Sequence, residues 1–165
     1  MRALLVFSVL LAAVWADPSG FSFSPAVGGG SGTSYTILGD GRITAVRIWD
    51  NGYIRGLQVR YGFEWSQLAG FTGGTELEFE LFDGEFIVQV SGKFSRYIQS
   101  LFIVTNRGRS MIAGQPSGTT FNMYAVHPMA ELRFLSGRYN GGLTSIATHW
   151  AILPMGNMAV NGTSD

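Results

Sequence analysis

A step that occurs three times along the chain most constrains its fold. A polar turn containing glycine is followed by two apolar residues three positions apart. The three steps are Ile54-x-x-Leu57, Ile98-x-x-Leu101 and Leu143-x-x-Ile146, and their first residues are 44 and 45 positions apart. Such a period, with about four short strands in each unit, is typical of similar sheets repeated around one core. Three units are too few for a usual propeller, so the spacing predicts a three-sided prism.

Strand patterns dominate the rest of the chain. Short segments that alternate or run apolar predict strands over residues 43–49, 57–62, 76–82, 86–92, 101–105 and 131–137. Glycine, Asn, Asp and Pro separate these segments and supply turn chemistry, as in Asp83-Gly84. No window of about a dozen residues beyond the first segment shows the apolar stripe of an amphipathic helix. The sequence therefore predicts an all-β chain.

The first sixteen residues are typical of a secretory signal peptide. Arg2 gives a short basic start, an apolar stretch follows, and Val14-x-Ala16 offers small residues at a cleavage site. A membrane anchor is the alternative, but the apolar run is shorter than the roughly 20 residues that a spanning helix needs. We expect a secreted protein without a membrane span.

Composition excludes several classes of site. The chain has no cysteine and only two histidines, which excludes thiol catalysis and disfavours a zinc site. Eleven Lys and Arg balance eleven Asp and Glu, and Lys93 is the only lysine. This balance argues against a nucleic-acid partner and weakens the case for sulfated polysaccharides. We expect no metal and no cofactor.

Several short blocks, in order, carry a resemblance to a known family. They are "GGGSGTSY" (28–35), "ITAVRIW" (43–49), "GLQVRYG" (56–62), "VQVSGKF" (88–94), "VTNRGR" (104–109), "SGTTFN" (117–122), "HPMAELRFLSGR" (127–138) and "HW" (149–150). In these blocks the chain resembles the jacalin-related lectins, and among them the animal zymogen granule protein 16 type. The resemblance implies a β-prism I fold of three Greek-key four-stranded sheets, with sugar binding at one end.

The resemblance also implies which loops bind sugar. They are a glycine-rich loop, here residues 27–32, a loop of the second repeat, here 91–97, and a Gly-x-x-x-Asp loop, here within 136–150. Backbone N–H groups freed by glycine donate to sugar hydroxyls, and an aromatic ring covers the apolar face of a sugar. The candidate carbohydrate-binding residues are Gly29, Gly30, Ser31, Lys93, Phe94, Asn140, Gly141, Gly142, Leu143 and Thr144.

The third loop departs from the family pattern. Thr144 stands where the aspartate belongs and Asn140 where the motif glycine belongs; a register shifted by one residue pairs Gly141 with Ser145, again without an acid. Replacing a charged acceptor by a hydroxyl costs roughly 1–2 kcal/mol of binding free energy. We expect Thr144 at an exposed loop end. Gly141 and Gly142 either approach a sugar or supply the positive φ of a hairpin, and both roles are compatible.

Other features have simpler interpretations. Glu76, Glu78 and Glu80 alternate along one strand and are expected on its solvated face rather than in a metal or catalytic set. His149-Trp150 is expected in packing, since no Ser and Asp accompany it at plausible positions. Tyr139 is either a sugar-stacking ring or a surface tyrosine. A sequon at Asn161 offers a glycosylation site.

The sequence thus predicts a secreted, non-enzymatic lectin for mannose-type, microbial or mucus glycans. The alternative is a lectin-fold interaction module of secretory granules or extracellular matrix that has lost sugar binding. The predicted organisation is a signal peptide at 1–16, a short segment at 17–25, the lectin domain at 26–153 and a polar tail at 154–165. Glycans or glycoproteins are the expected partners of a monomer or weak dimer.

Overall fold

Thirteen β-strands make up the computed structural model, which describes residues 20–152. They are β1 (Phe21–Gly28), β2 (Thr33–Ile37), β3 (Ile43–Asp50), β4 (Ile54–Tyr61), β5 (Glu64–Trp65), β6 (Ala69–Gly70), β7 (Thr75–Glu80), β8 (Ile87–Phe94), β9 (Ile98–Thr105), β10 (Ser110–Gly114), β11 (Thr119–Tyr124), β12 (Ala130–Tyr139) and β13 (Leu143–Ile152). The all-β prediction is confirmed. Within the described residues, no helix is long and apolar enough to cross a bilayer.

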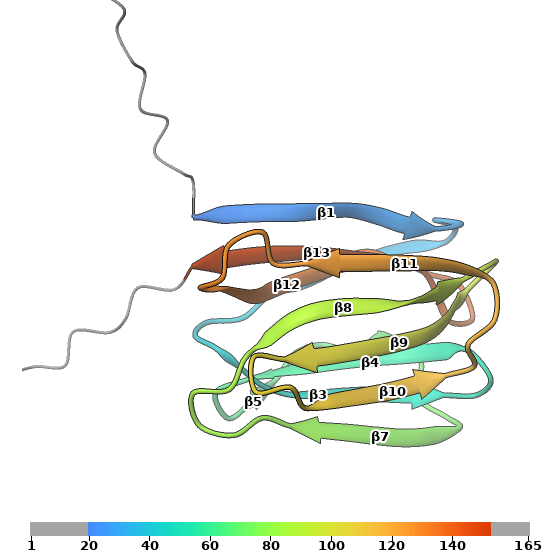
Figure 1. Cartoon of the computed structure of the whole chain (residues 1–165). Helices are drawn as coiled ribbons and strands as arrows, with labels where there is room; N and C mark the ends of the chain where they lie inside the picture. Colours follow the sequence, from blue (N-terminus) through green and yellow to red (C-terminus); the bar gives the residue numbers. More distant parts are fainter. Residues whose placement is uncertain (1–19, 153–165) are drawn as a thin grey trace, which may run out of the picture.

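The strands form three antiparallel sheets, as Figure 1 shows. Their strand orders are β1-β13-β12-β2, β10-β9-β8-β11 and β5-β4-β3-β7, with β6 also paired to β4. Because β5 and β6 both pair with β4, they act as one interrupted outer strand. Each sheet therefore has four strand positions built around a central hairpin, which confirms the predicted β-prism.

The predicted repeat is confirmed as the centre of the core. Its six apolar residues lie at the starts of β4, β9 and β13 and are each at most 1% exposed; they are Ile54, Leu57, Ile98, Leu101, Leu143 and Ile146. All six belong to one hydrophobic cluster. The repeat in the sequence thus marks the three strands whose side chains meet inside the prism, where burial of apolar surface stabilises the fold.

The three central hairpins also share one geometry. Asp50 pairs with Ile54, Phe94 with Ile98, and Tyr139 with Leu143, so each hairpin has a three-residue tip. The strand register shifts immediately before each tip. In each tip the first N–H donates to the third carbonyl, over 3.1, 2.9 and 2.8 Å respectively. The sequence repeat is therefore an approximate threefold repeat of local structure.

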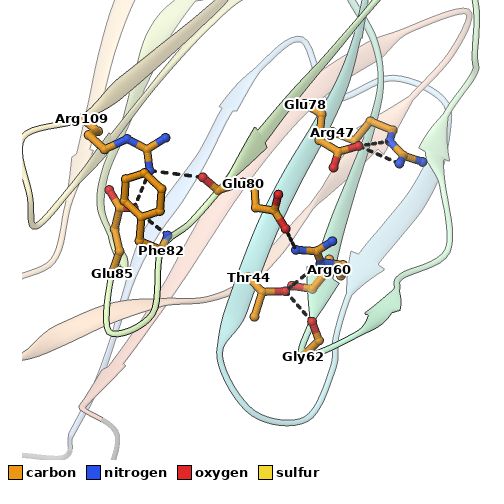
Figure 2. Close-up of polar contacts among 9 residues, drawn as sticks. All are labelled: Thr44, Arg47, Arg60, Gly62, Glu78, Glu80, Phe82, Glu85 and Arg109. Atoms are coloured by element: carbon orange, nitrogen blue, oxygen red, sulfur yellow. Dashed lines mark hydrogen bonds and ion pairs between the residues drawn. The ribbon is translucent and has the colours of Figure 1, made fainter.

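Charged side chains cover the outer face of the third sheet. Glu76, Glu78 and Glu80 are exposed, as predicted for the solvated face of β7. Arg47 pairs with Glu76. Figure 2 shows the pairs of Arg47 with Glu78 and of Arg60 with Glu80. These ion pairs account for Glu76, Glu78 and Glu80 without a metal or catalytic role.

The ends of the predicted organisation fall partly outside the described residues. The signal peptide (1–16), the polar tail (154–165) and the sequon at Asn161 lie outside residues 20–152. Sheet structure begins at Phe21, within the segment 17–25. Ile152 N–H donates to the Gly20 carbonyl over 2.8 Å, so the two ends of the described chain lie side by side.

Candidate functional site

The three predicted sugar-binding loops meet at one end of the prism. The loop after β1 and the hairpin tip between β8 and β9 both lie at the right-hand end in Figure 1. A Cβ added to Gly29 would lie 3.5 Å from the Arg96 carbonyl oxygen, and one added to Gly141 would lie 3.5 Å from the Tyr97 hydroxyl. The glycine-rich loop, the second tip and the third tip therefore form one continuous surface.

Hydrogen bonds fix the glycine-rich loop to the third hairpin. Gly30 N–H donates to the Thr144 carbonyl over 3.2 Å, and the Thr144 hydroxyl donates to the Ser31 carbonyl over 2.5 Å. Arg138 Nη1 donates to the Gly32 carbonyl over 2.7 Å. Gly29, Gly30 and Ser31 remain exposed. The loop is therefore held in place on its inner side while its outer side faces solvent.

Glycine is required at both ends of this glycine-rich loop. Gly28 has φ of 106°, and a Cβ there would lie 2.2 Å from the Thr144 carbonyl oxygen. Gly32 has φ of 93°, and a Cβ there would lie 2.2 Å from the Tyr139 carbonyl oxygen. Only glycine combines this backbone conformation with so close an approach.

The expectation that Thr144 lies at an exposed loop end is wrong. Thr144 is 1% exposed and Leu143 is fully buried. The physical reason is that β13 already begins at Leu143, whose side chain joins the core, while the glycine-rich loop covers the next residue. The Thr144 hydroxyl is used as a donor within the protein, so it does not stand in for the family's exposed acceptor.

The tip of the third hairpin combines both roles considered for its glycines. Gly141 is exposed with φ of 75°, which confirms the positive φ of a hairpin. Gly142 is buried, and a Cβ there would lie 2.5 Å from Tyr53 Cε2. Asn140 is exposed, and its N–H donates to the Gly142 carbonyl. Asn140 and Gly141 are therefore the parts of this tip that a ligand can reach.

Lys93 and Phe94 lie on β8, before the second tip. Lys93 Nζ donates to Thr120 Oγ1 over 3.1 Å. The Phe94 ring lies 6.3 Å from the Phe121 ring and packs against the core. Both contacts are with β11. The residue of this loop that the structure brings to the glycine-rich loop is Arg96.

Two tyrosines that sequence reasoning did not single out lie between the tips. Tyr53 and Tyr97 stack with their ring centroids 4.5 Å apart, and the Tyr53 hydroxyl donates to the Gly141 carbonyl over 3.4 Å. They occupy the same third position of the first and second tips, where the third tip has Gly142. Aligning the three repeats tip against tip would have revealed this aromatic pair.

Tyr139 packs within the protein. Its ring meets Phe71 edge to face at 5.6 Å and lies 6.4 Å from the Tyr35 ring. Phe71 is 41% exposed, so this pair presents an aromatic edge beside the third tip. Burial without a compensating charge raises the pKa of the Tyr35 hydroxyl above its usual range.

His149 has a partner that the sequence analysis missed. Its Nε2 lies 3.1 Å from Ser136 Oγ, since Ser136 and His149 lie on adjacent strands β12 and β13. The ring also packs between Phe23 and Phe134, and Trp150 is 1% exposed, which confirms the packing interpretation. No carboxylate bonds to His149 in the described part, so the pair lacks the third member of a hydrolase triad.

Asp50, the carboxylate nearest in sequence to the first tip, is bonded within the protein. Its two oxygens accept from the backbone N–H groups of Gly52 and Gly114, each over 2.9 Å. Within residues 20–152, no three His, Asp or Glu side chains are grouped to hold a metal ion. The site therefore offers backbone N–H groups, tyrosines and arginine side chains.

Comparisons with known proteins agree with this architecture. The jacalin-like lectin domain family matches residues 24–149. Human zymogen granule membrane protein 16 is 44% identical over 137 residues, covering 81% of this chain and 82% of that protein. The mouse protein of the same name matches to the same extent.

Solved structures share the fold. A prostate-specific glycoprotein lectin, WGA16, has a TM-score of 0.72 at 28% identity, covering 81% of this chain and all of that one. A mannose-binding lectin from Champedak has a TM-score of 0.69 at 25% identity, covering 81% of this chain and 98% of that one. On the family match and the 44% identity together, this chain belongs to the jacalin-like lectin domain family.

Proposed function

We propose that this protein is a secreted lectin that binds mannose-type, microbial or mucus glycans at the loop end of the prism. The contacts come from the exposed atoms of Gly29, Gly30, Ser31, Asn140 and Gly141, together with Arg96 and Tyr97. Gly142, Leu143 and Thr144 hold these atoms in place from below. Lectins are not enzymes, and catalysis forms no part of this proposal.

The observation that carries the proposal is that hydrogen bonds fix the glycine-rich loop to the third hairpin. Its carbonyls at Ser31 and Gly32 are bonded inward, to Thr144 and Arg138, while residues 29–31 stay exposed. A loop fixed before binding loses little conformational entropy when a ligand arrives, which favours affinity for small polar ligands. The solved lectin from Champedak, described as mannose-binding, supports mannose-type glycans as the first ligands to test.

A glycan array with matched glycine variants tests the proposal. Gly141→Val places a branched side chain at the third tip, at φ of 75° and beside the Tyr97 hydroxyl. Gly108→Val is the control, because Gly108 has φ of 73° and open space around it, in the turn between β9 and β10. We expect the wild type and the control to bind the same glycans and Gly141→Val to lose them. Equal binding by all three would contradict the proposal.

One observation favours the alternative function. The Thr144 hydroxyl is bonded to Ser31 and the Asp50 carboxylate is bonded to two backbone N–H groups, so neither is left as a free acceptor for sugar hydroxyls. The alternative is a lectin-fold interaction module of secretory granules or extracellular matrix that has lost sugar binding. An array without specific signals, from a protein shown to be folded by circular dichroism, would favour it.

Lys93 is proposed to contact acidic or extended glycans. It is half-buried on β8 and its ammonium bonds to Thr120, which leaves two of its three donors for a ligand. Lys93→Ala should weaken binding to acidic or extended glycans more than to mannose. Unchanged binding to every array-positive glycan would remove Lys93 from the site.

The route and the processing of the chain are part of the same proposal. We propose that the signal peptide at residues 1–16 directs secretion and that the lectin domain spans 26–153 as a monomer or weak dimer. The relatives named zymogen granule membrane protein 16 support passage through secretory granules. Sequencing the N-terminus of the secreted protein tests the cleavage site, and treatment with an N-glycosidase tests modification at Asn161.

A further inference from the structure

An aromatic cleft lies on the outer face of the sheet β1-β13-β12-β2. It has a volume of about 190 Å³, and Phe21, Phe23, Phe134 and His149 line it. Trp150 belongs to the core, so the preceding residue on the strand, His149, lies on the opposite face of the sheet. The cleft is near the end of the prism where β1 begins and β13 ends, at the left in Figure 1, opposite the candidate glycan site.

Ring contacts hold the walls of this cleft in place. The Phe23 ring stacks on the His149 ring with the centroids 6.3 Å apart, and the Phe134 ring lies 6.5 Å from the same imidazole. The contact of 3.1 Å between Ser136 Oγ and His149 Nε2 fixes the imidazole further. Phe21 and Phe23 are nevertheless 70% and 68% exposed. Exposed apolar side chains grouped around a cleft mark a binding surface.

The volume of the cleft limits the size of its ligand. An apolar cavity of about 150 Å³ holds a molecule as large as benzene. A cleft of about 190 Å³ therefore accepts one ring or a short alkyl chain. A small molecule fits this space better than a strand or a helix of a partner protein.

Arg133 adds a positive charge to the lining of the cleft. Its guanidinium carbon lies 5.6 Å from the centroid of the Phe134 ring, and its Nη1 donates to the Gly41 carbonyl. In the described part of the chain no carboxylate forms an ion pair with Arg133. Glu131, two residues earlier on β12, pairs instead with Arg42 over 3.1 Å. Two arginines thus share one carboxylate, which leaves positive charge beside an apolar surface.

We propose that this cleft binds a small amphipathic carboxylate. The apolar body of the ligand, an alkyl chain or one aromatic ring, lies against Phe23 and Phe134, and its carboxylate pairs with Arg133. Burial of the apolar body supplies the affinity, and the paired hydrogen bonds that a guanidinium donates select the carboxylate. The cleft is separate from the glycan site and does not depend on the proposed function.

The two histidines provide a reporter and a reference for nuclear magnetic resonance. His149 lines the cleft, whereas His127 lies between β11 and β12 and accepts from the Met129 N–H. The protein is titrated at constant pH with octanoate, octanol and acetate. We expect octanoate to shift the His149 ring signals saturably, octanol to do so more weakly, acetate to leave them unchanged, and His127 to respond to none. Hexanoate should bind about tenfold more weakly than octanoate, because each buried methylene contributes about fourfold in affinity.

Variants separate the charge from the apolar walls. Arg133→Gln should weaken octanoate binding about fivefold or more and leave octanol binding unchanged, since only a charge-assisted bond is lost. Arg107→Gln is its control, because Arg107 also bonds to a loop carbonyl, that of Asp83. Phe23→Ala removes a wall and should weaken both ligands. Phe63→Ala, at a residue that is 100% exposed and outside the cleft, should weaken neither.

Four results would overturn the proposal. They are no saturable shift of His149 with octanoate, and equal octanoate affinity in Arg133→Gln and wild type. A His149 signal that moves with protein concentration alone would show that a second copy of the chain covers the cleft. Octanoate shifts at residues 153–165 together with His149 would show that the chain's own end already occupies it.

Discussion

The hydroxyl of Thr144 donates a hydrogen bond of 2.5 Å to the carbonyl of Ser31, 113 residues earlier in the chain. This bond joins the first loop of the fold to its last hairpin. Gly30 N–H donates to the Thr144 carbonyl, so Thr144 contacts the loop through both its side chain and its backbone. The residue that the resemblance places at the position of the family's acid is thus a support for the glycine-rich loop.

Removing that hydroxyl should loosen the loop. Thr144→Val keeps the shape of the side chain but loses the bond to Ser31, whose carbonyl is left to water because Ser31 is exposed. We expect a loss of about 1 kcal/mol in the free energy of unfolding and faster hydrogen exchange at Gly30 N–H. Thr144→Ser retains the hydroxyl and is the control. Exchange at Gly30 that is equally slow in both variants would show that the bond does not support the loop.

Restoring the acid remains a test of sugar recognition. Thr144→Asp gains roughly 1–2 kcal/mol for mannose, the difference between charged and neutral hydrogen bonds, only if the glycine-rich loop moves and lets the carboxylate reach the sugar. Since Thr144 is 1% exposed and faces a carbonyl, the same change should also lower thermal stability, contrary to the expectation from sequence. Titration calorimetry and thermal unfolding measure the two effects. A folded variant that binds mannose no better than wild type would show that the glycine-rich loop keeps residue 144 out of the sugar site.

Replacing Asn140, which stands where the motif glycine belongs, with glycine has no conformational rationale. Asn140→Gly would help if that position needed a positive φ, but no non-glycine residue in the described part has one. The left-handed residue of the tip is Gly141. We therefore expect the double variant with Thr144→Asp to bind mannose as the single variant does.

The sequence predicted the features that follow from periodicity. The apolar steps at Ile54, Ile98 and Leu143 identified the three core strands, because a buried position must be apolar in every repeat. The burial of Thr144 was not predictable, since it depends on a loop more than a hundred residues away. The partner of His149 was missed for a related reason: Ser136 becomes its neighbour only through the β12–β13 register.

A single methyl group at Gly142 should disturb the stacked tyrosines. Its Cβ would lie 2.5 Å from Tyr53 Cε2 and 3.0 Å from the Ile54 carbonyl oxygen. We expect Gly142→Ala to cost about 1–3 kcal/mol of stability by overpacking. In Gly29→Ala the new Cβ meets only ordinary contact distances, so this control should cost little. Adding Tyr53→Ala should recover part of the loss in a double-mutant cycle, and independent, additive effects would contradict the steric account.

Glu131 should make the protein less stable as pH rises. Burial raises the pKa of its carboxyl, while the charges of Arg42 and Arg133 oppose the increase. A raised folded-state pKa means that the stability is highest below the unfolded value, about 4.3, and falls as pH rises through the folded value. Glu131→Gln should therefore raise the melting temperature at neutral pH and lose this advantage near pH 4. A variant less stable than wild type at neutral pH would show that the pair with Arg42 outweighs the burial.

Glu85 should have the opposite pH dependence. Burial raises the pKa of its carboxyl, but hydrogen bonds from Thr105, the Phe82 N–H and Arg109 outweigh it and hold the pKa below its usual value. The three bonds are 2.6, 2.8 and 2.6 Å long, and Figure 2 shows Arg109 and Phe82 beside the carboxylate. A lowered folded-state pKa gives stability that is present above about pH 4.3 and is lost as pH falls through the folded value.

Glu85→Gln should therefore cost about 2–3 kcal/mol at neutral pH, since bonds to a charged group are replaced by bonds to a neutral one. The difference from wild type should narrow as pH falls below about 4, where the wild-type carboxyl is protonated. Glu80→Gln is the matched control: its side chain is 67% exposed and pairs with Arg60, so its loss should stay under about 1 kcal/mol. Denaturant unfolding of the three proteins across this pH range measures the effect. A Glu85→Gln deficit that stays constant down to the acid transition would show that the charge of Glu85 does not provide the stability.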